Sequence, residues 1–307
     1  MQAETQTSPI LAAVLMVSSM AIIGVIDNVV VLLSDTIGLW QFHLSRALLM
    51  LPLIAGLSLL GMGTMRPRRL GPVIVRSLLI TVAMLFYFSS LALMPIAQAL
   101  AGLFTSPIFV LLISAFAMGQ KIGPWRILAV LIGFSGILLV LQLNPYEFDA
   151  KTLLPVAGGF FYALSSIVTR SHCAQESTVA LLAAMTVTLG LAGIAGLAVL
   201  SLVPHSFPDG FVTRGMVWDV QPVLVWIVLQ AVGSTIAVFM LIKSYQVGET
   251  SYVAVFEYSV MIFGPLFAWV AFGQTIGIMQ IAGIGLIAAA GALLGWRSRR
   301  AAQIEAT

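Results

Sequence analysis

Ten apolar stretches, each long enough to cross a lipid bilayer, take up almost all of this 307-residue chain. A helix needs roughly 20 apolar residues to cross the hydrocarbon core of a membrane. Only 8% of the residues are charged, whereas about one quarter are charged in an average soluble domain. The sequence therefore predicts an all-α integral membrane protein with ten transmembrane helices, at residues 10–33, 39–60, 72–94, 96–118, 124–143, 152–170, 179–203, 221–245, 250–272 and 277–296.

Lysine and arginine are distributed unevenly between the two sides of these spans. The odd-numbered turns hold only Lys151 and Arg214, and Arg46 lies inside a span. The other eleven of the fourteen basic residues lie at the even-numbered turns, their flanks and the C-terminal tail. Because positive residues accumulate on the cytoplasmic side, we expect both termini there. The eleven residues are Arg66, Arg68, Arg69, Arg76, Lys121, Arg126, Arg170, Lys243, Arg297, Arg299 and Arg300.

The two halves of the chain resemble each other at a spacing of 154 residues. The pentad GQKIG at 119–123 recurs as GQTIG at 273–277, each time between the fourth and fifth span of its half. Five spans per half is an odd number, so the second half must be inverted in the membrane, as in many alternating-access transporters. We predict a cytoplasmic N-terminus at 1–9, repeats at 10–143 and 152–296, an external linker at 144–151 and a cytoplasmic tail at 297–307.

Several short motifs connect the chain with a known family. They are ALMPIAQA at 92–99, SPIF at 106–109, GQ at 119–120 and GFSG at 133–136, then YALSSIVTR at 162–170, EY at 257–258, Pro265 and GQ at 273–274. With these motifs the chain resembles the drug/metabolite transporter superfamily, in its ten-helix EamA-type branch. The family usually has glutamate where this chain has Gln120 and Gln274.

Asp27 and Arg46 are charged residues at matching depths in the first and second spans. Charged side chains inside a membrane are costly and are usually kept for a function. We interpret them as a pair, or near-pair, in the outer half of a cavity, where they act as a gate or bind a zwitterionic substrate. The alternative is a permanent ion pair that ties the two helices together.

Glu257 is the first candidate for proton coupling or for binding a cationic or donor-rich group of the substrate. It lies about two turns into the ninth span, between Phe256 and Tyr258, with no residue of opposite charge next to it in the sequence. Desolvation in such an apolar setting favours the neutral acid, so the carboxyl can bind and release a proton. The alternative is a carboxyl that caps neighbouring backbone or pairs with Lys243.

The remaining candidates for substrate binding are polar or aromatic residues inside the spans. Histidine can bind a ligand or relay a proton, although a buried histidine is more often a packing group. Glutamine in a helix bundle often only bridges helices, but the family resemblance places the fourth and eighth helices on the central cavity. Tyrosines offer an apolar face with a polar tip. These candidates are His43, Gln98, Gln230, Tyr87, Tyr162 and Tyr258.

Catalytic and nucleotide-binding motifs are absent from the sequence. It contains no His-Glu-x-x-His pair, no glycine-flanked serine elbow and no phosphate-binding loop followed by lysine. We therefore expect no enzymatic activity, no cofactor and no metal. A channel is not expected either, because the sequence does not indicate the charged rings or the carbonyl filter that a channel needs. A nucleic-acid partner is not expected, because no separate basic domain exists. An intramembrane enzyme and a non-transporting scaffold are the alternatives from other classes.

The expected function is secondary transport of a small organic metabolite by alternating access, in a bacterial inner membrane. The family resemblance implies an amino acid, an amine, or a vitamin-like or nucleotide-like compound as substrate. It favours export, and uptake of a heterocyclic vitamin such as a flavin is the alternative. The other expected partners are membrane lipid and a proton, and the protein is expected to be a monomer or a homodimer.

Overall fold

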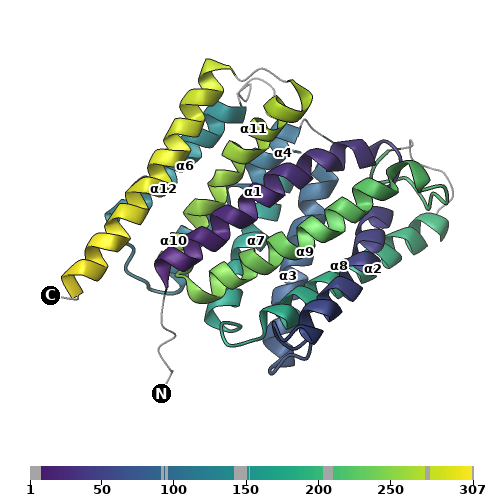
Figure 1. Ribbon diagram of the computed structural model, residues 1–307, viewed down its shortest axis with the longest axis horizontal. Helices are drawn as coiled ribbons and strands as arrows, with labels where there is room; N and C mark the ends of the chain where they lie inside the picture. The colour runs from purple at the N-terminus through teal and green to yellow at the C-terminus, as the bar shows by residue number, and fades with distance from the viewer. Residues whose placement is uncertain are drawn as a thin grey trace.

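The computed structural model describes residues 8–90, 93, 96–141, 151, 153–202, 210–273 and 277–305. Within these ranges the chain forms helices and no strand, as Figure 1 shows. The first half contains α1 (Pro9–Ser34), α2 (Leu39–Leu59), α3 (Leu70–Ser90), α4 (Ile96–Leu103), α5 (Ser106–Leu112) with a π-helical turn at Ile113–Ala117, and α6 (Pro124–Leu141).

The second half repeats this order of elements. It contains α7 (Leu153–Ser171), α8 (Thr178–Leu202), a 3-10 turn at Gln221–Val223 that leads into α9 (Leu224–Val247), α10 (Thr250–Phe256), a 3-10 turn at Glu257–Ser259, α11 (Val260–Phe272) and α12 (Ile278–Glu305). The predicted linker at 144–151 lies outside the described residues except for Lys151.

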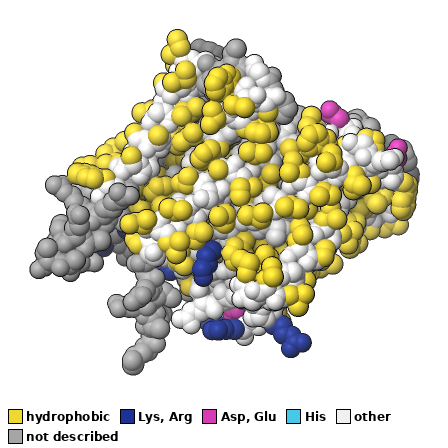
Figure 2. All heavy atoms as spheres, viewed as in Figure 1, with side chains coloured by type: hydrophobic (Ala, Val, Ile, Leu, Met, Phe, Trp, Pro, Cys, Tyr) yellow, Lys and Arg dark blue, Asp and Glu magenta, His cyan; other side chains and the backbone are white. Residues whose placement is uncertain are grey.

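The protein is an all-α, multi-pass membrane protein. Among the described residues, nine helical stretches are long and apolar enough to cross a membrane, and the apolar part of α12, Ile278–Leu294, is shorter. Figure 2 shows hydrophobic side chains covering the flank of the bundle, with lysine and arginine gathered at the end near the N-terminus. The start of α1 and the end of α12 lie at this end (Figure 1), which we call the termini side; the opposite end is the distal side.

Helix packing follows the symmetry of an inverted repeat. The closest pairs are α6 with α12, α1 with α9, α3 with α7, and α2 with α8. By order along the chain, α1, α2, α3 and α6 of the first half correspond to α7, α8, α9 and α12 of the second. Exchange of corresponding helices turns the α1–α9 pair into the α7–α3 pair. The same exchange leaves the α2–α8 and α6–α12 pairs unchanged. The arrangement therefore confirms two five-helix halves related by inversion.

Backbone breaks occur at equivalent positions of the two halves. The fourth span breaks at Phe104 and Thr105, so that α5 begins at Ser106, and the ninth breaks at Glu257–Ser259, so that α11 begins at Val260. Ser106 and Val260 differ by 154, the spacing of the sequence repeat. In the first half Pro107 contributes to the break, because proline lacks an N–H and its ring clashes with the preceding turn.

The pentads that follow these broken spans begin with the same backbone conformation in both halves. Their first glycines have positive φ, 61° at Gly119 and 65° at Gly273. This left-handed conformation is costly for residues with a side chain, which explains a glycine at both positions. The recurrence of this glycine in the sequence is thus matched by a recurrence of its backbone conformation.

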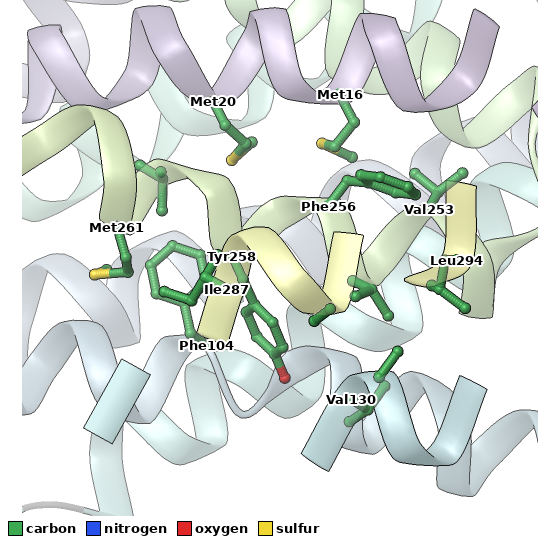
Figure 3. Close-up of a cluster of buried hydrophobic side chains, with 14 of the residues drawn as sticks. Met16, Met20, Phe104, Val130, Val253, Phe256, Tyr258, Met261, Ile287 and Leu294 are labelled. Carbon is green, nitrogen blue, oxygen red and sulfur yellow. The ribbon is translucent and has the colours of Figure 1, made fainter. Parts of the chain in front are cut away.

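A large apolar core joins the two halves on the side of α6 and α12. In Figure 3, Met16 and Met20 of α1 point toward Phe256 and Tyr258, which in turn lie against α6 and α12. Glycines allow α6 and α12 to approach closely, since a Cβ atom at Gly136 would lie 2.7 Å from the carbonyl oxygen of Gly283. This packing holds the fifth and tenth spans together as one unit.

Candidate functional site

A cavity of about 520 Å³ opens between the two halves on the distal side. Its walls come from the C-terminal ends of α1 and α6, from α3, α4 and α11, from the start of α12 and from residues 210–214. It contains both polar and aromatic groups. The lining residues are Gly24, Asp27, Asn28, Val30, Ser34, Asp35, Tyr87, Phe88, Leu100, Val140, Leu141, Gly210, Phe211, Arg214, Val260, Met261, Gly264, Pro265 and Gln280.

On the termini side, charged residues link helices of the two halves together. Arg126 at the start of α6 forms an ion pair with Glu249, just before α10, and also donates to the Ser251 hydroxyl at 3.1 Å. Arg170 at the end of α7 donates to the backbone carbonyl of Gln246 at 2.6 Å. These contacts tie α6, α7, α9 and α10 at the end opposite the cavity mouth.

A second set of contacts on the termini side joins the turns at 60–69 and 172–177. The carboxylate of Glu176, which is 7% exposed, accepts hydrogen bonds from the backbone N–H groups of Arg68 and Arg69, both at 2.7 Å. The Gln246 amide donates to the carbonyls of Cys173 and Glu176 at 2.9 and 2.8 Å. Together these contacts join helix ends and turns on the termini side, whereas the cavity lies on the distal side.

Glu257 lies between the cavity and the contacts on the termini side. It is 1% exposed and lies one turn before Val260 and Met261, which line the cavity. Tyr245 donates to its Oε1 at 2.5 Å and Ser106 to its Oε2 at 3.3 Å. Tyr162 is a third hydroxyl that hydrogen-bonds to this carboxyl. Hydroxyl groups from three other helices therefore satisfy the carboxyl. Lys243, the alternative partner considered from the sequence, is exposed on α9.

Asp27 and Arg46 lie near each other but do not touch. Their charges interact, yet no ion pair within 4 Å joins these two described residues. Asp27 is half-buried on the cavity wall. Arg46 is 9% exposed, and its guanidinium lies over the ring of Phe42, 5.1 Å from the centroid. Of the two residues predicted as a pair or near-pair, Asp27 thus lines the cavity and Arg46 does not.

His43 is enclosed by aromatic rings. Its ring centroid lies 5.1 Å from that of Phe88, edge-on at 88°, and 5.3 Å from that of Phe42. It is 1% exposed, and neither ring nitrogen has a hydrogen-bond partner. Phe88 therefore separates His43 from the cavity, which Phe88 and Tyr87 both line.

Two other predicted residues, Gln230 and Tyr258, lie away from the cavity lining. Gln230 donates to the Ile26 carbonyl at 2.6 Å and so bridges α9 and α1. The Tyr258 ring is fully buried in the core at α6 and α12, and its hydroxyl has no partner. Gln98 belongs to α4, but its side chain lies outside the described part of the structure.

Sequence reasoning missed several residues that the structure brings to these sites. In the sequence, Ser106 stands out only as the first residue of the SPIF motif, and Tyr245 only as the last residue of the eighth predicted span. Their hydroxyls meet Glu257 because two helices break and cross there. The Arg126–Glu249 ion pair joins residues 123 positions apart, so neither residue type nor spacing could have indicated it.

Comparison with known proteins agrees with this architecture. Residues 7–142 match the model of the EamA-like transporter family. A crystal structure superposes with a TM-score of 0.74 at 20% identity, covering 94% of this chain and 98% of the other, which supports the fold.

Curated relatives cover about three quarters of the chain. A riboflavin transporter of Vibrio cholerae is 26% identical over 246 residues, 78% of this chain and 75% of its own. A riboflavin transporter of Rhizobium johnstonii is 29% identical over 245 residues, 78% and 74% of the two chains. An S-adenosylmethionine uptake transporter of Rickettsia bellii is 22% identical over 214 residues, 70% and 68%. Residues 7–142 therefore form an EamA domain, and the chain is a non-enzymatic membrane transporter that is similar to members of the drug/metabolite transporter superfamily.

Proposed function

We propose that the protein takes up riboflavin, or a closely related planar nitrogen heterocycle, by alternating access. The observation that carries this proposal is the cavity of about 520 Å³ between the two halves, with Tyr87, Phe88 and Phe211 in its wall. Small-molecule sites commonly enclose roughly 300–1,000 Å³ and combine aromatic surface with a few polar groups. The names of the riboflavin and S-adenosylmethionine transporters point to the same class of solute.

The proposed orientation follows from the charges. Basic residues gather on the termini side, so both termini are cytoplasmic and the cavity opens to the exterior of a bacterial inner membrane. A solute then enters the cavity from outside while the contacts of Arg126, Arg170 and Glu176 keep the inner end closed. Uptake is preferred over export because the Rickettsia bellii relative is named an uptake transporter.

The inverted repeat indicates how the second conformation of the transport cycle forms, the one that is open on the termini side. Exchange of the conformations of the two halves would close the distal side and open the termini side. In such an exchange Gln280, at the cavity mouth, corresponds to Arg126, because the two differ by 154 residues. Opening inward must therefore break the Arg126–Glu249 ion pair.

Glu257 is the proposed coupling residue. It is enclosed between the cavity and the inner end, and its partners come from both halves: Ser106 from the first, and Tyr162 and Tyr245 from the second. A movement of one half against the other changes this set of hydrogen bonds. Binding and release of a proton by the carboxyl would then accompany the change of state.

Uptake of radiolabelled riboflavin into proteoliposomes tests the proposal. Purified protein should give time-dependent, saturable uptake that protein-free liposomes lack, and unlabelled riboflavin should compete. Asp27 and Asp35 on the cavity wall favour a cationic solute as the second candidate, so S-adenosylmethionine is included as a competitor and as a labelled substrate. Absence of both riboflavin uptake and riboflavin binding would refute the proposed substrate.

A further inference from the structure

Three polar side chains at or behind the cavity wall, Asp27, His43 and Arg46, form no hydrogen bond among the described residues. Both ring nitrogens of His43 are buried without a partner, whereas Asp27 lines the cavity and Arg46 lies over the ring of Phe42. We call these three residues the unpaired trio. An unsatisfied buried polar group such as the His43 imidazole costs about 1–3 kcal/mol. Such a group in a native structure points to a missing partner.

Other buried polar groups in the bundle are satisfied, which sets the trio apart. Gln41, Arg76, Gln230, Gln246 and Glu257 all hydrogen-bond to neighbouring helices or loops. The other buried unpartnered side-chain atoms among the described residues are single hydroxyls, on Ser77 and Tyr258. Only at the trio do several unsatisfied groups of different chemistry gather at the edge of a cavity.

Phe88 lies between the cavity and His43. It lines the cavity on one side. On the other, it packs edge-on against His43 and lies 5.5 Å from Phe42, the ring over which Arg46 lies. Rotation of the Phe88 ring would therefore join the cavity to His43, and Arg46 lies one ring further, over Phe42. Asp27 needs no such movement, because it already lies on the cavity wall.

The chemistry of the trio defines its ligand. A guanidinium presents a planar fork of donors that fits two acceptors, a carboxylate accepts N–H groups, and a neutral imidazole both donates and accepts. The complementary group carries carbonyl acceptors beside an N–H donor. A flat ring with such an imide edge would also stack on the aromatic walls formed by Tyr87 and Phe88.

We propose that Asp27, His43 and Arg46 recognise the imide edge of a planar nitrogen heterocycle, and that Phe88 covers this site when the cavity is empty. This inference rests on the proposed function and specifies which side chains determine the substrate. Riboflavin carries an imide of this kind, with its N–H at position 3. In the occupied state the imide carbonyls accept from Arg46 and His43 while the N–H donates to Asp27.

Quenching of flavin fluorescence by purified protein in nanodiscs tests the proposal. The probes are riboflavin and 3-methylriboflavin, which lacks the imide N–H. Wild-type protein should bind riboflavin at least about tenfold more tightly, because the methyl group removes a charge-assisted hydrogen bond and leaves Asp27 unpaired. This comparison needs no variant. Equal affinity for the two flavins would overturn the assignment.

Variants then locate the effect. Asp27→Ala, which removes every acceptor of the side chain, should bind the two flavins within about twofold of each other, and Arg46→Lys, which keeps the charge but loses the fork, should weaken riboflavin binding about tenfold. Matched controls are Asp219→Ala, an exposed carboxylate on the distal side, and Lys243→Gln, an exposed cation on α9. Both controls should keep wild-type affinity and discrimination.

The outcomes separate this inference from the proposed function. If wild-type protein binds riboflavin and the trio variants keep wild-type affinity and discrimination, the trio is not the recognition site and the proposed function stands. If wild-type protein binds neither flavin, both proposals fail. Free methionine as a competitor covers the zwitterion alternative: displacement of riboflavin by methionine, lost in Arg46→Lys, would mean that the trio binds an amino-acid group instead.

Discussion

The hydroxyl of Ser106 donates to the carboxylate of Glu257 across 3.3 Å, and each residue lies at the break of its own helix. Ser106 begins α5 in the first half, and Glu257 begins the 3-10 turn before α11 in the second. The two interrupted spans of the inverted repeat therefore contact each other directly, next to the cavity. Any rocking of one half against the other must change this contact. In the proposed mechanism, the contact therefore connects the change of conformation with proton binding by Glu257.

Replacement of Glu257 by glutamine should separate binding from coupling. Glutamine keeps the shape of the side chain and an acceptor for Tyr245, but it cannot exchange a proton. We expect Glu257→Gln to keep riboflavin affinity within about twofold and to lose the stimulation of uptake by an inward proton gradient. The measurement is uptake into proteoliposomes with and without a pH difference.

The matched control for this experiment is Tyr245→Phe. It removes the 2.5 Å hydrogen bond to the carboxyl and leaves the carboxyl in place, so the response to the pH gradient should persist even if the rate falls. A Glu257→Gln protein with a wild-type response to the gradient would contradict the coupling role.

Glu257 also illustrates what the sequence could and could not predict. A lone carboxyl within an apolar span stands out in a sequence, because charge in a membrane is costly. Its partners do not stand out: Tyr245 and Ser106 are 12 and 151 residues away, and only the helix breaks bring them to it.

The fold was more predictable than the site because it depends on local patterns. Spans follow from apolar length, and the repeat follows from two glycine turns whose backbone needs positive φ. The site depends instead on which face of each helix points inward. Gln230 and Tyr87 look alike as polar residues inside spans, yet one bridges α9 to α1 and the other lines the cavity.

Loss of the Arg126–Glu249 ion pair should favour opening of the termini side, and the chain's single cysteine can report it. Cys173 is fully buried at this end, and burial raises the pKa of its thiol to about 11. Because the thiolate is the reactive form, maleimide should label wild-type Cys173 slowly at pH 7.5 and faster as the pH rises toward that pKa.

In Glu249→Gln we expect labelling of Cys173 to be about two- to fivefold faster, the range for a partly exposed ion pair. Lys121→Gln removes an exposed charge from the same end and should leave the rate unchanged. Riboflavin, the proposed ligand of the cavity on the distal side, should slow the labelling of Glu249→Gln again. Identical rates for wild type and Glu249→Gln would show that this pair does not hold the inner end closed.

Gln230 should behave as a structural residue, unlike the unpaired trio. Its amide donates to the Ile26 carbonyl and its carbonyl accepts from Ser234. Hydrogen bonds between membrane helices contribute about 0.6–1.7 kcal/mol, so Gln230→Leu should lower the unfolding temperature measurably while riboflavin affinity stays within about twofold of wild type. Thermal unfolding and flavin titration of the same sample measure both. A large loss of affinity without a loss of stability would place Gln230 in the binding site instead.

Close packing of α6 on α12 predicts that Gly136→Val destabilises the fold. A Cβ atom at this position would lie 2.7 Å from the backbone oxygen of Gly283, and rotation of a side chain cannot relieve contact with a backbone. Overpacking of this kind costs about 1–3 kcal/mol. The control is Gly285→Ala on α12, where a Cβ atom meets nothing within 4 Å and alanine is the better helix former. The temperature of thermal unfolding should therefore fall for Gly136→Val and hold or rise for Gly285→Ala.

The same variant also tests whether α6 and α12 move during transport. Because the α6–α12 pair is converted into itself when the two halves are exchanged, the Gly136→Val protein that does fold should transport at the wild-type rate per molecule. A folded variant with impaired transport would mean that α6 and α12 move against each other during the cycle.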